Sequence, residues 1–267
     1  MAGEDERREA LKRLCGFSQW AGKPPGPEST FTCDFFFPAA ALPEWRVLKA
    51  LAPSAAGLRR VRRYILEPAG AKGEATGGAQ GEAQGGALDL MSFECPSWAD
   101  AREAVIDYMA GCATGGFRPG ADLQYEFGEV AFGGRTSGGM ALFVRGNMFV
   151  VVRRALAQPH TDELARCIDR LLAGRPGDGD RGGKVPPEVV RFEALAPLAE
   201  GKRVPLELSA QDPLGRPVWH QLFVRGGEVG RADDRLYLAP GAGDVRVEAF
   251  TFNENGHWAR RALTTKA

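Results

Sequence analysis

The chain has 267 residues, of which 44% are hydrophobic and 25% charged, with 34 Lys and Arg against 34 Asp and Glu. These proportions are typical of a globular protein, and the length suffices for two domains that each bury a core. The formal net charge of zero, balanced in both halves, excludes the basic excess that a nucleic-acid backbone requires, so we expect no nucleic acid as the main partner.

The first quarter of the chain predicts helices and strands in alternation. Glu4–Leu14 is a short helix candidate, and the aromatic-rich stretch Phe31–Phe37 is typical of a strand. Pro43 suits the first position of a helix, so we expect a helical turn or short helix over Pro43–Leu51. Leu58–Leu66 predicts a strand from its branched and aromatic residues.

A low-complexity segment, residues 69–87, carries a near-tandem Gly/Ala repeat and predicts a flexible loop between two paired strands. Leu88–Cys95 is the returning strand. Ser97 then predicts the start of a helix that runs to about Cys112, with Asp100 three residues on as its capping-box partner.

The following segment predicts more of the same sheet. We expect strands at Leu123–Phe132, Met140–Val144 and Met148–Arg153, the last two joined by a tight Arg-Gly-Asn hairpin turn. A second helix is expected at Asp162–Leu172, because its leucines and isoleucine recur at helical spacing.

Residues 174–187 form a linker rich in Gly, Pro and Asp, after which the pattern changes to short strands with closely spaced turns. We therefore predict an α+β domain, a sheet-and-helix unit, over residues 1–173 and an all-β domain over residues 188–267. The two are expected to fold independently.

The last third of the chain resembles bacterial immunoglobulin-like domains. Val204–Val218 (VPLELSAQDPLGRPV) is similar to their opening strand and turn, and Gly241–Phe252 to their penultimate strand; the matching turn positions are Asp212, Gly215, Pro217 and Val218. The resemblance implies an immunoglobulin-like β-sandwich of the kind that serves as a spacer, adhesin or docking domain, outside the cytoplasm as a rule.

The first part of the chain resembles bacterial proteins of unknown function that share a hairpin and a helix with it. The hairpin is Phe143–Val152 (FVRGNMFVVV) and the helix Leu164–Leu172 (LARCIDRLL). This resemblance implies a sheet backed by helices and carries over no activity.

Candidate catalytic and metal-binding residues are few. His160, His220 and His257 have no metal-ligand spacing, and the glycine clusters match no phosphate-binding loop, so we predict no metal and no cofactor. His160, beside Asp162 and Glu163, suits either an acid–base cluster or an ordinary helix start. We expect no catalytic residue, and the helix start is the favoured interpretation.

The five cysteines contain no Cys-x-x-Cys pair. Cys95 precedes a helix, where it is either a reactive thiol or, as favoured, a buried structural residue. Cys15 with Cys33 is left as the one plausible disulfide pair, and free thiols are the alternative.

Two sets of residues are candidates for binding. Arg59, Arg62, Arg153 and Arg154 end or crowd two predicted strands, and they form an anion-binding patch if those strands lie close, or else protect an edge strand. In the strand that follows Pro217, alternation places Leu222 and Val224 on the core face with His220, and Trp219 and Phe223 on the other. This aromatic strip is expected to contact a partner or the first domain.

The sequence thus favours a non-enzymatic binding or structural protein whose partner is a protein or a surface polymer. The alternatives are a hydrolase or transferase with its site near Cys95 or His160, and an assembly or secretion accessory protein. No apolar stretch predicts a membrane span. The expected location is cytoplasmic if Met1 is the native start, and the periplasm or cell envelope if a signal peptide was removed.

Overall fold

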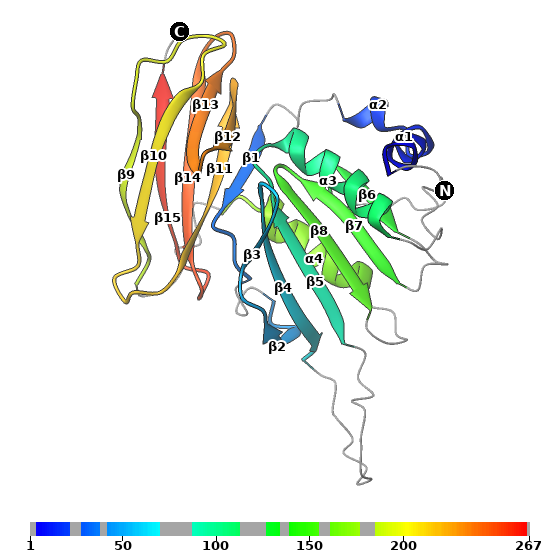
Figure 1. Ribbon diagram of the computed structural model, residues 1–267. Coiled ribbons are helices and arrows are strands. Elements are labelled where there is room, and N and C mark those ends of the chain that lie inside the picture. Colours follow the sequence, from blue (N-terminus) through cyan, green and yellow to red (C-terminus); the bar gives the residue numbers. More distant parts are fainter. Residues whose placement is uncertain are drawn as a thin grey trace.

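The computed structural model describes residues 4–21, 28–37, 42–69, 87–112, 127–133, 139–154, 161–176 and 185–265. The fold is mixed α+β and mostly β, with three antiparallel sheets in the described residues. Figure 1 shows a large sheet that carries the helices, and a two-sheet sandwich beside it. No described helix has both the length and the apolar character needed to cross a lipid bilayer.

The large sheet runs in the order β2-β4-β5-β8-β7-β6, with β3 beside β4. Its strands are β2 (Trp45–Ala50), β3 (Ser54–Ala56), β4 (Arg59–Pro68), β5 (Leu88–Glu94), β6 (Val130–Gly133), β7 (Met140–Arg145) and β8 (Met148–Arg154). The helices are α1 (Glu4–Leu14), α2 (Phe17–Trp20), α3 (Trp98–Gly111) and α4 (Thr161–Ala173).

Both faces of the large sheet are buried at its central strands. Because side chains alternate along a strand, Phe149 and Val151 of β8 pack against α3, whereas Val150 and Val152 face α4. Helices α1 and α3 contact each other on the first face. This double burial explains the nearly continuous apolar run of β8.

The sandwich consists of two four-stranded sheets. The inner sandwich sheet, which lies next to the large sheet, has the order β1-β11-β14-β15; the outer sandwich sheet has the order β12-β13-β10-β9. Their strands are β1 (Ser29–Cys33), β9 (Glu188–Ala194), β10 (Val204–Gln211), β11 (Val218–Arg225), β12 (Gly227–Ala232), β13 (Arg235–Pro240), β14 (Val245–Asn253) and β15 (Trp258–Thr265). Leu222, Val247, Phe192 and Leu238 are among the residues that form the core between them.

Strand β1 comes from the N-terminal part of the chain but belongs to the sandwich. It pairs antiparallel with β11, from Ser29 opposite Val224 to Cys33 opposite His220. Figure 1 shows this blue strand at the junction between the sandwich and the large sheet. Phe31 and Cys33 are buried in the sandwich core. Residues 188–267 therefore supply only three of the four strands of the inner sandwich sheet.

The Arg-Gly-Asn hairpin turn between β7 and β8 holds β1 from its other edge. The side-chain oxygen of Asn147 accepts from the Thr32 N–H at 2.6 Å, and its side-chain nitrogen donates to the Thr32 carbonyl at 2.8 Å and to the Cys95 carbonyl at 3.0 Å. Gly146 has φ +55°, and a Cβ there would lie 2.2 Å from the Thr30 carbonyl oxygen, so glycine is required. Arg145 reaches Asp169 of α4 with two hydrogen bonds of 2.8 Å.

Much of the predicted secondary structure is confirmed. Helices α1, α3 and α4 lie where they were expected, and the Ser97 hydroxyl accepts from the Asp100 N–H at 3.2 Å as the capping box requires. The strands β4, β5, β7 and β8 also match. Residues 70–86 of the predicted loop, 123–126 of a predicted strand and 177–184 of the linker lie outside the described residues.

Three predictions differ from the structure. The strand expected over Leu123–Phe132 is shorter where it is described: residues 127–129 are bends, and β6 covers Val130–Gly133. The helix expected over Pro43–Leu51 is wrong: this stretch is strand β2, whose pairing with β4 outweighs the helical preference of its isolated residues. The strand expected over Phe31–Phe37 begins at Ser29 and ends at Cys33, because Asp34 adopts φ +57° and turns the chain toward the large sheet.

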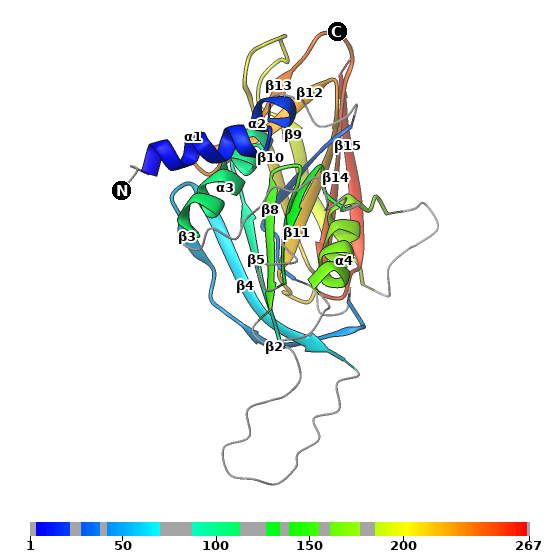
Figure 2. The same cartoon turned by 90° about the vertical axis from the view of Figure 1, so that its right-hand side faces the viewer.

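The division into independent units at 1–173 and 188–267 stays a prediction. What the structure adds is a shared core: Trp219 and Phe250 of the inner sandwich sheet pack with Leu66 and Val150 of the large sheet and with Ile168 of α4. Figure 2 shows α4 beside β14 and β15. Strand β1 and this shared core therefore both extend across the domain boundary that was predicted from composition.

We predict that Asn147→Ala lowers the free energy of unfolding by about 2–4 kcal/mol, because it leaves backbone groups of Thr32 and Cys95 buried without partners. Urea unfolding followed by circular dichroism measures this change. Asn255→Ala, in an exposed turn, is the matched control and should change stability by less than about 0.5 kcal/mol. Equal effects of the two substitutions would contradict the role given to Asn147.

Candidate functional site

The predicted aromatic strip exists, but it is buried. Leu222 and Val224 face the sandwich core, while Trp219 and Phe223 lie on the opposite face and are only 1% and 7% exposed. Trp219 stacks on Phe252 with ring centroids 4.2 Å apart. The first part of the chain covers the strip, so of the two expected contacts, a partner or the first domain, it makes the second. The strip therefore offers no open surface.

The four predicted arginines do not come together in a patch. Arg59 pairs with Asp107 at 2.5 Å and Arg153 pairs with Asp89, both on the face that carries α3. By strand alternation, Arg62 and Arg154 lie on the opposite face.

Their positions along the strands separate them further. The register places Ile65 of β4 level with Arg153 of β8. Arg59 is six residues before Ile65 (65 − 59), which at the rise of a strand separates Arg59 from Arg153 by roughly 20 Å along the strand direction. Strand β4 is also not an edge strand, since β2 and β3 pair with one side of it and β5 with the other. Arg59 and Arg153 each serve an individual ion pair.

Of the two catalytic candidates, Cys95 is described by the structure and occupies a structural position. Cys95 is fully buried, burial raises the pKa of its thiol to about 12, and the thiol donates to the Phe93 carbonyl. Cys15 and Cys33 are both free, so they do not pair. His257 bonds through Nδ1 to the Val185 carbonyl at 3.2 Å, and His160 lies outside the described residues. Among the described residues no group of His, Cys, Asp and Glu is arranged to hold a metal ion.

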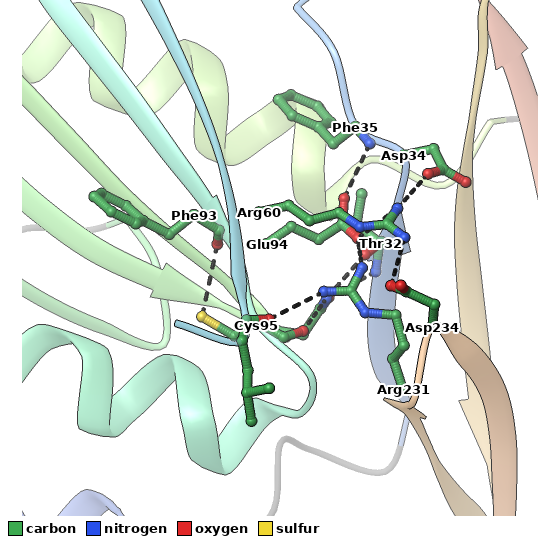
Figure 3. Close-up of polar contacts among 11 residues, drawn as sticks. Thr32, Asp34, Phe35, Arg60, Phe93, Glu94, Cys95, Arg231 and Asp234 are labelled. Atoms are coloured by element: carbon green, nitrogen blue, oxygen red, sulfur yellow. Dashed lines mark hydrogen bonds and ion pairs between the residues drawn. The ribbon is translucent and has the colours of Figure 1, made fainter. Parts of the chain in front are cut away.

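An ionic cluster with a buried centre lies in the seam between the large sheet and the sandwich, as Figure 3 shows. Glu94 of β5 and Arg231 of β12 are each about 95% buried and meet at 2.5 Å. Arg60 of β4 bonds to Asp34 at 2.6 Å and to Asp234 at 3.0 Å.

The cluster also fixes the chain that follows β1. The second Glu94 oxygen accepts from the Phe35 N–H at 3.3 Å, just after the turn at Asp34. Burial raises the pKa of Glu94, and the attraction of Arg231 opposes that rise. The cluster holds two guanidinium groups and three carboxylates, and its buried pair, Glu94 and Arg231, is satisfied within the seam. We assign this pair a structural role.

A pocket of about 340 Å³ lies between α4 and the residues that lead into β2. It is lined by Leu42, Pro43, Glu44, Trp45, Cys167, Arg170 and Leu171. Arg170 donates to the Cys167 sulfur at 3.1 Å. The lining offers one thiol, one guanidinium and the carboxylate of Glu44, but no histidine to activate the thiol.

A group of arginines lies at the far end of the inner sandwich sheet. Here Arg175, just after α4, approaches Arg225 of β11, Arg246 of β14 and Arg260 of β15 around two carboxylates, Glu28 and Glu248. We call these six residues the arginine cluster. Glu248 is 2% exposed and accepts from Arg246 at 2.7 Å, and it also pairs with Arg175 and Arg260.

Glu28 occupies the outer part of the arginine cluster. Its Oε1 lies 2.6 Å from Arg225 and its Oε2 lies 3.3 Å from Arg175. Arg175 and Arg260 also lie over the rings of Phe223 and Phe250, at 5.4 and 5.7 Å. The guanidinium groups are thus held at the rim of the aromatic face that the large sheet covers.

The arginine cluster has an excess of positive charge in a protein whose net charge is zero. Four guanidinium groups face two carboxylates there among the described residues. Arg225 and Arg246 stand directly opposite each other on adjacent strands, an arrangement that costs stability. Their side chains are 64% and 49% exposed, so an anion in solution can reach them.

Sequence reasoning missed the arginine cluster because its members are far apart along the chain. Residues 28, 175, 225, 246 and 260 come from five segments, and none is part of a basic run. The usable signal was the alternation in β11 and β14, which puts Arg225 and Arg246 on the outward face with Phe223 and Phe250.

Substitutions of Trp219 test the buried aromatic face. We predict that Trp219→Ala costs about 3–5 kcal/mol of unfolding free energy, because it empties a fully buried site. Trp219→Phe should cost less than about 1.5 kcal/mol, since the indole N–H has no hydrogen-bond partner in the described residues and its loss removes an unpaired donor. Thermal and urea unfolding measure both. A phenylalanine variant as unstable as the alanine variant would show that the indole N–H is needed.

The pH dependence of stability tests the position of His220. This side chain is buried and bonds through Nδ1 to the Thr251 hydroxyl at 2.9 Å. Burial lowers the pKa of His220, against a small opposing effect of Asp34. The folded state therefore releases the proton more readily than the unfolded state. The contribution of His220 to stability is therefore fully present above its unfolded-state pKa of about 6.5, and it is lost as the pH falls below that value.

We expect the unfolding free energy of the wild type to fall more steeply than that of His220→Gln between about pH 7.5 and about pH 5.5. His257→Gln, in a surface turn, is the control and should keep the wild-type slope. Identical slopes for the wild type and His220→Gln would mean that His220 is not buried as a neutral group.

The chain was compared with protein-family models, with curated protein sequences and with solved structures, and it has no significant match in any of the three. Its function therefore has to be inferred from the geometry of its own side chains.

Proposed function

We propose that the protein is a non-enzymatic binding protein that holds an acidic surface polymer at the arginine cluster. The observation that carries the proposal is the excess of guanidinium groups over carboxylates on one exposed end of a rigid sheet. Guanidinium groups bind the oxygens of phosphate, sulfate and carboxylate in pairs, and a preformed group of them loses little entropy on binding.

The sandwich supports this proposal from a second direction. We include in the proposal the resemblance to bacterial immunoglobulin-like domains, which is carried by Val204–Val218 and Gly241–Phe252. This resemblance suggests a docking or adhesive module. The shared core with the large sheet makes the presenting surface stiff, which favours recognition of a repetitive polymer over an adaptable partner.

The alternative is an enzyme of the hydrolase or transferase class, and the pocket beside α4 favours it. Its volume of about 340 Å³ is at the lower end of the range for small-molecule sites. Cys167 and Arg170 would be the reacting and anion-binding groups. We rank this alternative second, because none of the residues lining the pocket is a histidine that would act as a base for the thiol.

Binding of defined acidic polymers tests the proposal. Isothermal titration with polyphosphate and with polygalacturonate, at low ionic strength, should give saturable binding that weakens as salt is added, whereas neutral dextran should not bind. Arg225→Ala/Arg246→Ala should lower the affinity at least about tenfold, because it removes the two most exposed guanidinium groups of the arginine cluster.

Arg191→Ala/Arg235→Ala is the matched control, since it removes the same charge from exposed positions on the outer sandwich sheet. It should keep most of the wild-type affinity. Equal losses in the two double variants would mean that binding follows total charge only, and no binding of either polymer by the wild type would refute the proposal.

A further inference from the structure

We propose that Glu28 acts as an internal competitor for the anion site, occupying the position that an oxyanion of the ligand takes between Arg175 and Arg225. This inference rests on the proposed function and adds to it the exact contact point and its regulation. The site it defines accepts a group with two oxygens on one atom, namely a phosphate or a carboxylate.

The geometry of Glu28 is that of a bound ligand. Its two oxygens are divided between two guanidinium groups, at 2.6 Å from Arg225 and 3.3 Å from Arg175. These arginines lie 197 and 147 residues away along the chain, so no local turn imposes the contact. A carboxylate that bridges two distant guanidinium groups shows that their spacing fits one oxyanion.

The two carboxylates of the arginine cluster differ in how easily they can be displaced. Glu248 is 2% exposed and held by three arginines, so it belongs to the fixed frame of the site. Glu28 is 35% exposed and its side chain contacts only the two outer arginines in the described structure. Exposed ion pairs contribute little free energy, so an incoming anion can replace Glu28 but not Glu248.

Displacement of Glu28 has a structural consequence because this residue immediately precedes β1. The ion pairs fix the first residue of the segment that completes the inner sandwich sheet, next to Ser29, which pairs with Val224. Binding of an anion at Arg225 and Arg175 would therefore release the start of β1 while Thr32 stays held by Asn147. The site couples ligand binding to the N-terminal end of one strand.

The experiment compares Glu28→Gln with wild type in the titrations with polyphosphate and polygalacturonate. Glu28→Gln removes the competing charge, so it should tighten binding about three- to tenfold. This is the change in affinity expected when the ligand no longer has to displace one exposed bridging ion pair. Glu207→Gln is the matched control: Glu207 pairs with Arg191 on the outer sandwich sheet and is 37% exposed, close to the 35% of Glu28. It should leave the affinity within about twofold of wild type.

The outcomes separate this inference from the proposed function. If wild type binds and Glu28→Gln binds no tighter than Glu207→Gln, the competitor role is overturned and the proposed function survives. If neither wild type nor Glu28→Gln binds either polymer, both fail. Tightening with polyphosphate alone assigns the site to phosphate, and tightening with polygalacturonate alone assigns it to carboxylate.

Hydrogen exchange gives an independent readout of displacement. Saturating polymer should speed amide exchange at the start of β1 in wild type, near Ser29. It should have no such effect in Glu28→Gln, where the ion pairs of residue 28 are already absent. Unchanged or slower exchange there in ligand-bound wild type would mean that the ligand binds beside Glu28 without replacing it.

Discussion

The pairing of β1 with both β11 and the Asn147 side chain is the contact on which the rest of the structure depends. Strand β1 inserts between the sandwich and the large sheet, and its buried second half, Phe31–Cys33, needs a partner for each backbone group because water does not reach it. On one edge β11 supplies the partners. On the other edge no strand of the described residues pairs with β1, and the amide of Asn147 replaces one at Thr32.

Several otherwise unrelated features follow from that contact. Gly146 has no side chain because the hairpin turn must come close to the Thr30 carbonyl. Asp34 turns the chain into the seam, where Glu94 accepts from the Phe35 N–H and Tyr64 accepts from the Phe37 N–H at 2.7 Å. Phe35 then packs edge-on against Trp219, with ring centroids 5.3 Å apart. The entry of β1 thus brings the first part of the chain onto the aromatic face of the sandwich.

The same arrangement decides which surface is left for binding. The aromatic end of the inner sandwich sheet is buried by α4 and the large sheet, and in the seam Glu94 pairs with Arg231 while Arg60 pairs with Asp34. The opposite end of that sheet, beyond the C-terminal end of α4, carries the arginine cluster. The ion pairs of Glu28 link this exposed end to the start of β1. The proposed binding site and the central structural contact therefore share one strand.

Local features of the structure were predictable from the sequence, and long-range ones were not. Alternation in β11 was enough to separate Leu222 from Trp219, and capping chemistry was enough to start α3 at Ser97. The pairing of Ser29 with Val224, 195 residues away, has no local signal, because edge pairing depends on backbone groups that every residue carries. The failure at Pro43–Leu51 has the same origin, since only the presence of β4 makes that stretch a strand.

Differential scanning calorimetry of the intact chain tests the central claim, that β1 and the shared core join the two parts into one cooperative unit. We expect a single transition whose calorimetric enthalpy equals its van't Hoff enthalpy. Two resolved transitions, or a calorimetric enthalpy well above the van't Hoff value, would show that the sandwich and the large sheet unfold separately and would contradict it.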